Sequence, residues 1–105
     1  NVWRSDVFII NNEFRIAKLR VGLVQTIGTN KALRVKIIGD SGYITASTDN
    51  KTEVLADENS AYNGKRYVDI YPEAVFQNNF FIQLEWEGSE LLTVALPIQI
   101  EIEYL

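Results

Sequence analysis

The chain has 105 residues, of which 47% are hydrophobic, and a formal net charge of −4 at pH 7. A single domain of this size can bury a core without disulfides or a structural metal. The absence of cysteine and histidine excludes thiol catalysis, cysteine–zinc sites, histidine-based triads and haem ligation by these residues. The acidic balance argues against nucleic-acid binding, and no apolar run approaches the roughly 20 residues of a membrane span. We expect one soluble domain over residues 1–105, taken from a longer protein and needing no cofactor.

Short segments of alternating apolar and polar residues follow one another, and none has a helical period. Gly, Asn and Pro mark the turns between them, and Pro72 ends a strand because it has no N–H to donate. This spacing predicts an all-β fold, an immunoglobulin-like antiparallel β-sandwich of seven to eight strands. The strands are expected at 7–10, 14–24, 32–38, 43–47, 52–56, 66–71, 79–87 and 91–105.

The phase of the alternation predicts which residues are buried. Within each strand, side chains two positions apart lie on the same face, so the apolar set is expected to face the other sheet. The expected core is Leu19, Val21, Leu33, Val35, Val68, Ile70, Ile82, Leu84, Trp86, Val94 and Leu96.

The last segment, Leu91 to Leu105, is long for a strand. It alternates strictly from Val94 to Tyr104. Fully extended it would measure about 50 Å, against about 20 Å for a usual strand. We expect it to form a hairpin with 79–87 across Gly88-Ser89, and to be less buried from about Ile98 onward than its alternation implies.

Charge is segregated along the sequence. Six bases and no acid lie between Arg15 and Lys36, whereas the rest holds four bases and all fourteen acids. If 14–24 and 32–38 pair as neighbours, their polar faces form one basic surface. Gly22 and Val24 lie on the same face of their strand as these bases. The bases of this surface are Lys18, Arg20, Arg34 and Lys36. It could receive an acidic peptide with aromatic anchors, and the alternative is a plain solvated sheet face.

The acidic residues do not form a recognisable site. Glu85 and Glu87 share one outward strand face, but no loop has the ligand spacing of a calcium site. The glycines are too sparse for a phosphate-binding loop. The sequence therefore predicts no metal site, no catalytic residue and no enzyme activity.

Five segments occur along the chain in the order FRIAKLRVGLVQ, LRVKIIGDSG, VDI, FFIQLEWEG and LPIQI. This ordered set resembles the appendage (ear) domain of the adaptins, most closely that of the α subunit of the endocytic clathrin adaptor complex. The resemblance implies an immunoglobulin-like sandwich lobe that binds short aromatic and acidic peptide motifs of accessory proteins during vesicle transport. It implies a cytoplasmic protein at coated membranes, held there by the rest of an adaptor complex, with only indirect membrane contact. From about Ile98, the last strand would be a connector to a second lobe.

The family's peptide site falls on Gly22, Val24, Ile37 and Asn63, with Val24 in place of a lysine and Ile37 in place of an aromatic residue. Alternation puts Ile37 on the buried face. If the alignment with the adaptin family is shifted by one residue, Lys36 takes the place of Ile37 in the site. We favour the alternation, since a slip would bury Arg34 and Lys36. The expected peptide-binding residues are Arg20, Gly22, Val24, Lys36, Ile37 and Asn63.

A second hypothesis is a structural immunoglobulin-like module of a surface or extracytoplasmic protein, which assembles through a strand edge. The glycosylation pattern Asn50-Lys51-Thr52 and the long alternating end favour it. The sequence on either side of these 105 residues would distinguish the two hypotheses.

Overall fold

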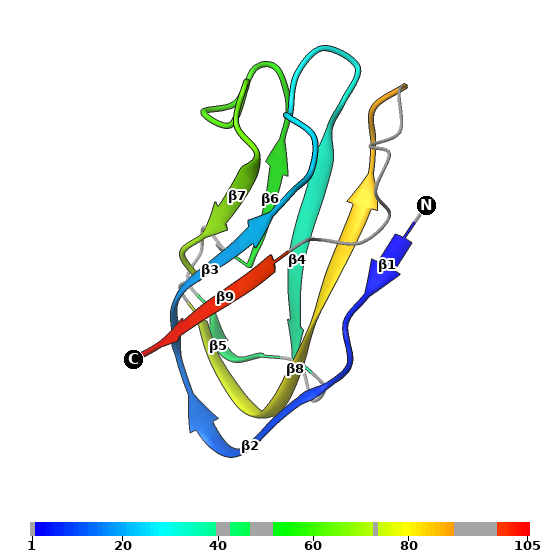
Figure 1. Cartoon of the computed structure of the whole chain (residues 1–105). Helices are drawn as coiled ribbons and strands as arrows, with labels where there is room; N and C mark the ends of the chain where they lie inside the picture. Colours follow the sequence, from blue (N-terminus) through cyan, green and yellow to red (C-terminus); the bar gives the residue numbers. More distant parts are fainter. Residues whose placement is uncertain (1, 40–42, 47–51, 73, 90–98) are drawn as a thin grey trace.

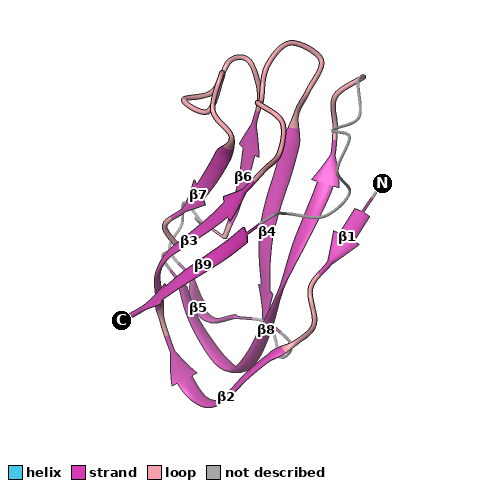
Figure 2. Cartoon of the chain, viewed as in Figure 1, coloured by secondary structure: helices cyan, strands magenta, loops and turns pink. Residues whose placement is uncertain are grey.

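The computed structural model describes residues 2–39, the backbone of 43–46, and residues 52–72, 74–89 and 99–105. The described residues form strands joined by turns and loops (Figure 2). No helix that could span a membrane is found among them. The strands are β1 (Val2–Arg4), β2 (Phe8–Phe14), β3 (Ile16–Gly22), β4 (Leu33–Gly39), β5 (Tyr43–Ala46), β6 (Glu53–Ala56), β7 (Tyr67–Ile70), β8 (Ala74–Trp86) and β9 (Gln99–Tyr104).

These strands form two sheets in which every described pair is antiparallel (Figure 1). The larger sheet has the order β1-β8-β4-β6, and β2 and β5 pair with the first half of β8. The smaller sheet has the order β7-β3-β9. The sheets face each other, and β6 lies against β7 at one side. The predicted antiparallel β-sandwich is therefore confirmed.

The core lies between the two sheets and follows the predicted phases. Eight of the residues expected there are fully buried, namely Leu19, Val21, Leu33, Val35, Val68, Ile70, Ile82 and Leu84. Trp86 is half-buried and packs against them. Val94 and Leu96 lie outside the described residues. Phe80, which lies on the inward phase of the expected strand 79–87, is also fully buried. Phe76 is fully buried too, although the sequence did not place it in a strand.

The sandwich has an immunoglobulin-like centre, but its terminal strands have exchanged sheets. In the immunoglobulin fold the second strand pairs with the fifth, and the third with the sixth. The pairs β3–β7 and β4–β8 reproduce these contacts. However, β9 occupies the place beside β3 that belongs to the first strand in that fold, and β1 occupies the place beside β8 that belongs to the last.

Two predicted pairings are wrong. The strands β3 and β4 do not pair with each other, because they belong to different sheets. The chain between them, residues 23–32, crosses from one sheet to the other and turns at Thr29-Asn30. The hairpin of 79–87 with the final strand is also wrong for the described part of that strand, since β9 pairs with β3.

The final strand belongs to the sandwich from Gln99 to Tyr104. It pairs with β3 over this range, and Ile100 and Ile102 are half-buried against the core. The partial burial of Ile100 and Ile102 agrees with the lower burial expected for this end of the strand, and Ile98 lies outside the described residues. The connector role of this segment stays a prediction. A second lobe after Leu105 remains a prediction.

Candidate functional site

The outer face of the smaller sheet carries an arginine clamped between an acid and an aromatic ring. Arg20 on β3 lies opposite Asp69 on β7 and donates two hydrogen bonds to its carboxylate, at 2.7 and 2.9 Å. Its guanidinium also lies 4.1 Å from the centre of the Tyr67 ring. Asp69 is buried, whereas about a third of the Arg20 side chain is exposed. This is a charge-assisted bidentate pair combined with a cation–π contact.

The same cluster ties a loop to the sheet. The Tyr62 hydroxyl donates to the Asp69 carbonyl oxygen at 2.9 Å, and its ring meets Tyr67 edge-on. Burial raises the pKa of Tyr62. The hydrogen bond to Asp69 raises the pKa of Arg20 above its already high ordinary value, so the guanidinium stays charged at any pH at which the domain is folded.

Beside this cluster the sheet has a position without a side chain. Gly22 lies between Tyr67 on β7 and Gln99 on β9. It follows Arg20 by two positions, so both residues belong to the outer face. The next position of that row, Val24, is 44% exposed just beyond the end of β3.

The outer face of the larger sheet carries a network of opposite charges. Arg34 on β4 binds Glu87 at 2.7 Å and Glu53 at 3.5 Å. Lys36 binds Glu85 at 2.7 Å and Glu53 at 3.8 Å. Hydrogen bonds from Arg34 and Lys36 lower the pKa values of Glu87 and Glu85 respectively. The bases of β4 are thus neutralised by the strands on both sides.

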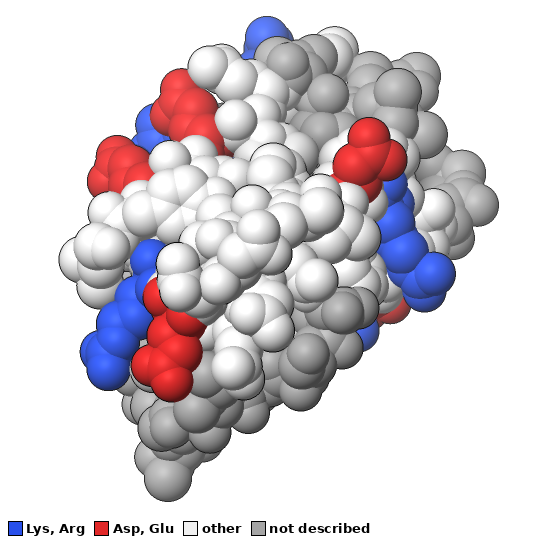
Figure 3. Space-filling model, turned by 90° about the horizontal axis from the view of Figure 1, so that it is seen from below, with Lys and Arg blue, Asp and Glu red and all other residues white. Residues whose placement is uncertain are grey.

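The predicted basic surface therefore does not exist. Arg20 lies on one outer face of the sandwich, and Lys36 lies on the opposite one. An end view also shows acidic and basic side chains next to one another at the margins, around an uncharged centre (Figure 3). Bases and acids that are separated in the sequence are interleaved in space.

The six predicted site residues divide into three groups. Arg20 and Gly22 lie on β3 in the smaller sheet, and Val24 lies just beyond its end. Asn63 lies in the loop beside Gly28, and this loop is hydrogen-bonded to the chain that leaves β3. Lys36 is on the other sheet, and Ile37 is fully buried. A peptide on the surface cannot reach Ile37, so its placement in the site is wrong, and the alternation had the correct phase.

Tyr67 and Asp69 belong to this cluster and were missed. They come from β7, which the sequence did not place beside β3. A signal was present in the strand RYVDIY, where Tyr67 and Asp69 are two positions apart and the apolar residue between them is buried. Alternation therefore predicts that both side chains lie on the outer face. It does not predict that their strand pairs with β3.

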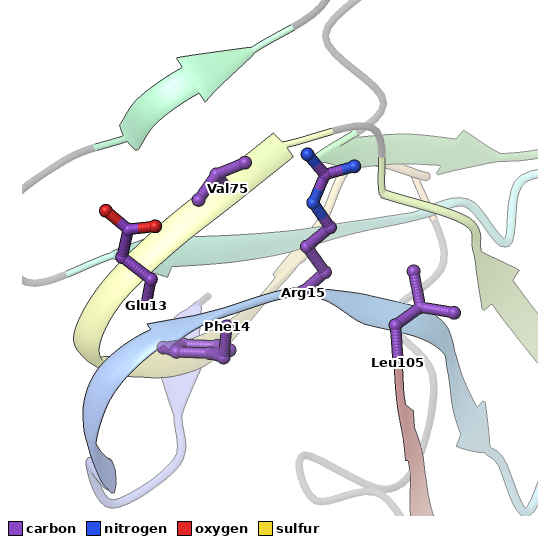
Figure 4. Close-up of a pocket in the computed structure, with 5 residues that line it drawn as sticks. All are labelled: Glu13, Phe14, Arg15, Val75 and Leu105. Atoms are coloured by element: carbon purple, nitrogen blue, oxygen red, sulfur yellow. The ribbon is translucent and has the colours of Figure 1, made fainter.

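A separate open pocket of about 270 Å³ lies at the opposite end of β3, near the end of the chain. Glu13 and Arg15 flank Val75 there, and Leu105 lies at its edge (Figure 4). It contains none of the six predicted site residues. Among the described residues there is also no group of three or more acids that could hold a metal ion.

No family model matches the chain, and no curated protein or solved structure is significantly similar to it.

Proposed function

We propose that this domain is a non-enzymatic protein-interaction module, which binds a short extended peptide on the outer face of its smaller sheet. The observation that carries the proposal is the position of Gly22 beside Tyr67, whose ring is held by Arg20. A missing side chain lets a peptide backbone approach the sheet. Tyrosine and arginine are among the residues most enriched in protein interfaces.

The charge on this face favours an aromatic anchor over an acidic one. The Arg20 guanidinium uses two of its nitrogens on Asp69, which cancels most of its field. Its remaining N–H groups can still donate to a peptide carboxylate. Acidic residues of the peptide would therefore add orientation and a small salt dependence, while an aromatic side chain beside Tyr67 would supply most of the affinity.

The finer assignment, an adaptor ear that recruits accessory proteins to clathrin-coated membranes in the cytoplasm, is supported only by the ordered sequence resemblance. It stays a prediction, as do the remaining subunits of an adaptor complex as partners. The module described above does not depend on it.

A titration of the isotope-labelled domain with peptides containing Trp or Phe beside Asp or Glu tests the proposal. We expect amide shifts at Arg20, Gly22 and Tyr67, with a dissociation constant on the order of micromolar or weaker, because one shallow face offers few anchors. Gly22→Leu should abolish binding by filling the space of the peptide backbone.

Lys36→Gln is the matched control, because Lys36 lies on the other sheet and its loss should leave binding unchanged. Charge reversal at Arg20 is unsuitable, since a new carboxylate would meet the buried Asp69. The absence of shifts up to millimolar peptide, or shifts centred on Lys36, would contradict the proposal.

A second candidate function is assembly through a strand edge. One observation favours it, namely that β9 is the outermost described strand of the smaller sheet and pairs only with β3. Face and edge are different surfaces, so the two functions are compatible.

A further inference from the structure

The edge of β9 carries backbone groups that no described strand uses. In an antiparallel ladder, alternate residues direct their N–H and C=O groups to one neighbour, and the others direct them to the opposite side. Over Gln99–Tyr104, about three residues therefore present both groups to the free edge. Such an edge can accept a further strand.

The outward side chains of the smaller sheet alternate in charge from strand to strand. Along one row, Asp69 on β7 is followed by Arg20 on β3 and Glu101 on β9. In the next row, Lys18 on β3 lies opposite Glu103 on β9. Opposite charges on adjacent strands stabilise the sheet, and like charges destabilise it. The pattern ends in two acids, so a following strand should carry bases at both positions.

These two acids are not already paired by salt bridges. Both are exposed, and within the described part of the chain neither has a basic group within 4.0 Å. Glu101 accepts one hydrogen bond, from Gln99 on its own strand. The acid at the edge of the other sheet differs, because Glu53 binds two bases and its strand β6 lies against β7.

The inward side of the same strand is apolar and partly uncovered. Ile100 and Ile102 are half-buried, and Tyr104 is 46% exposed. The β1–β2 segment of the facing sheet also supplies half-buried apolar side chains, and one of them, Phe14, has its ring 6.3 Å from that of Tyr104. Apolar side chains of an added strand would cover these residues.

A second copy of this chain does not fit the edge. In the two antiparallel registers that pair most of β9 with the outward rows aligned, Glu101 of one copy would lie opposite Glu101 or Glu103 of the other. Direct opposition of like charges is destabilising, so these glutamates protect the edge from self-association.

We propose that the free edge of β9 binds an extended segment of a partner protein in which Lys or Arg alternates with apolar residues. The bases face outward beside Glu101 and Glu103, and the apolar residues face Ile100 and Ile102. This inference rests on the second candidate function and is independent of the peptide site at Gly22.

The test uses the peptide Thr-Lys-Val-Lys-Ile-Lys-Val-Thr, with binding followed by fluorescence anisotropy and amide shifts. Wild-type protein should bind it with shifts centred on β9. Glu101→Gln/Glu103→Gln, which places no like charges beside Arg20 and Lys18, should weaken binding about three- to tenfold, as expected for two exposed cross-strand pairs, and should remove the preference over the same peptide with Glu in place of Lys. Asp6→Asn/Glu58→Asn, with the same change in net charge at exposed sites on other segments, should leave the preference for the basic peptide unchanged.

N-methylation separates strand addition from simple charge attraction. A strand presents alternate N–H groups to each side, so methylating one alternate set should abolish binding and methylating the other set should be tolerated. Equal binding of both methylated peptides, equal binding of a scrambled peptide of the same composition, or shifts outside β9 would overturn the inference. Because Gly22→Leu leaves the edge intact, loss of aromatic-peptide binding in that variant does not bear on this result.

Discussion

Leu84 lies at the centre of the larger sheet, and its environment sets the cost of shortening it. It is fully buried and pairs with Val35 on one side and Trp3 on the other. Leu84→Ala removes three buried carbons and leaves a cavity, so we expect a loss of about 2–5 kcal/mol in the free energy of unfolding. Urea unfolding at equilibrium measures it.

Ile9→Ala is the matched control for this prediction. Ile9 also lies in a strand that pairs with β8, but its side chain is 68% exposed. Its truncation should change the free energy of unfolding by no more than about 0.5 kcal/mol. Equal losses in the two variants would show that the buried face of β8 is assigned wrongly.

Gly88 shows a requirement that the sequence could not explain. The sequence predicts a hairpin turn at Gly88-Ser89, for which glycine would supply backbone freedom. In the structure a Cβ on Gly88 would lie 2.2 Å from the carbonyl oxygen of Asn30. Glycine is therefore needed for close approach of two backbones, and such an approach depends on tertiary contacts that a single sequence does not reveal.

At the scale of the strands, the charge segregation has a spatial explanation. The basic segment contains β3 and β4, and each is flanked on both sides by strands that carry acids. Bases in an inner strand and acids in its neighbours give alternating cross-strand pairs. Charges that are segregated along the sequence therefore alternate in sign from strand to strand across each sheet.

Alternation predicted the faces of the strands but not their partners. A period of two is a local property of one strand, so the buried phases of β3, β4 and β8 could be read directly. Pairing depends on the whole fold. One pairing signal was available, because Arg34 and Lys36 have the same spacing as Glu85 and Glu87, with opposite charge. Matching these two segments by charge would have predicted that β4 pairs with β8.

The pairs on the larger sheet give stability a specific pH dependence. The pKa of Glu85 is lowered from 4.5 first by its hydrogen bond from Lys36, and the pKa of Glu87 by its bond from Arg34. A carboxyl whose pKa is lower in the folded state contributes stability above its unfolded value and loses it as the pH falls through the folded value. Urea unfolding should therefore show decreasing stability below about pH 4.5.

Glu85→Gln/Glu87→Gln isolates this contribution from the other carboxylates. Near neutral pH the double variant should be less stable than wild type, because the two ion pairs are lost. Below about pH 4.5 the difference between the two proteins should shrink, since the wild-type glutamates become protonated. A difference that stays constant down to about pH 3 would show that these pairs do not stabilise the fold.

At the scale of the whole molecule, the sequence did not predict which sheet each terminal strand joins. The expected strand 91–105 follows 79–87 across Gly88-Ser89, so chain proximity favours a hairpin, and that expectation fails for residues 99–104, which pair with β3. The side chains of β9 match those of β3 instead. Its outward acids lie opposite the bases of β3, and its inward isoleucines pack against the core. Its alternation indicated a strand with one apolar face, but could not identify the sheet that this face covers.

Removal of residues 99–105 tests whether the last strand is structural. Without β9 the described part of the smaller sheet consists of β7 and β3, and Leu19 and Val21 of β3 lose cover from Ile102 and Ile100. An isolated strand pair is marginal, and a small domain has only about 5–15 kcal/mol of stability in total. We expect the truncated domain to lose its cooperative urea transition and the dispersion of its amide spectrum. A chain that lacks only Leu105, which is 82% exposed, should retain both. If the longer truncation instead unfolds at the wild-type urea concentration, β9 is a connector that docks without supporting the sandwich.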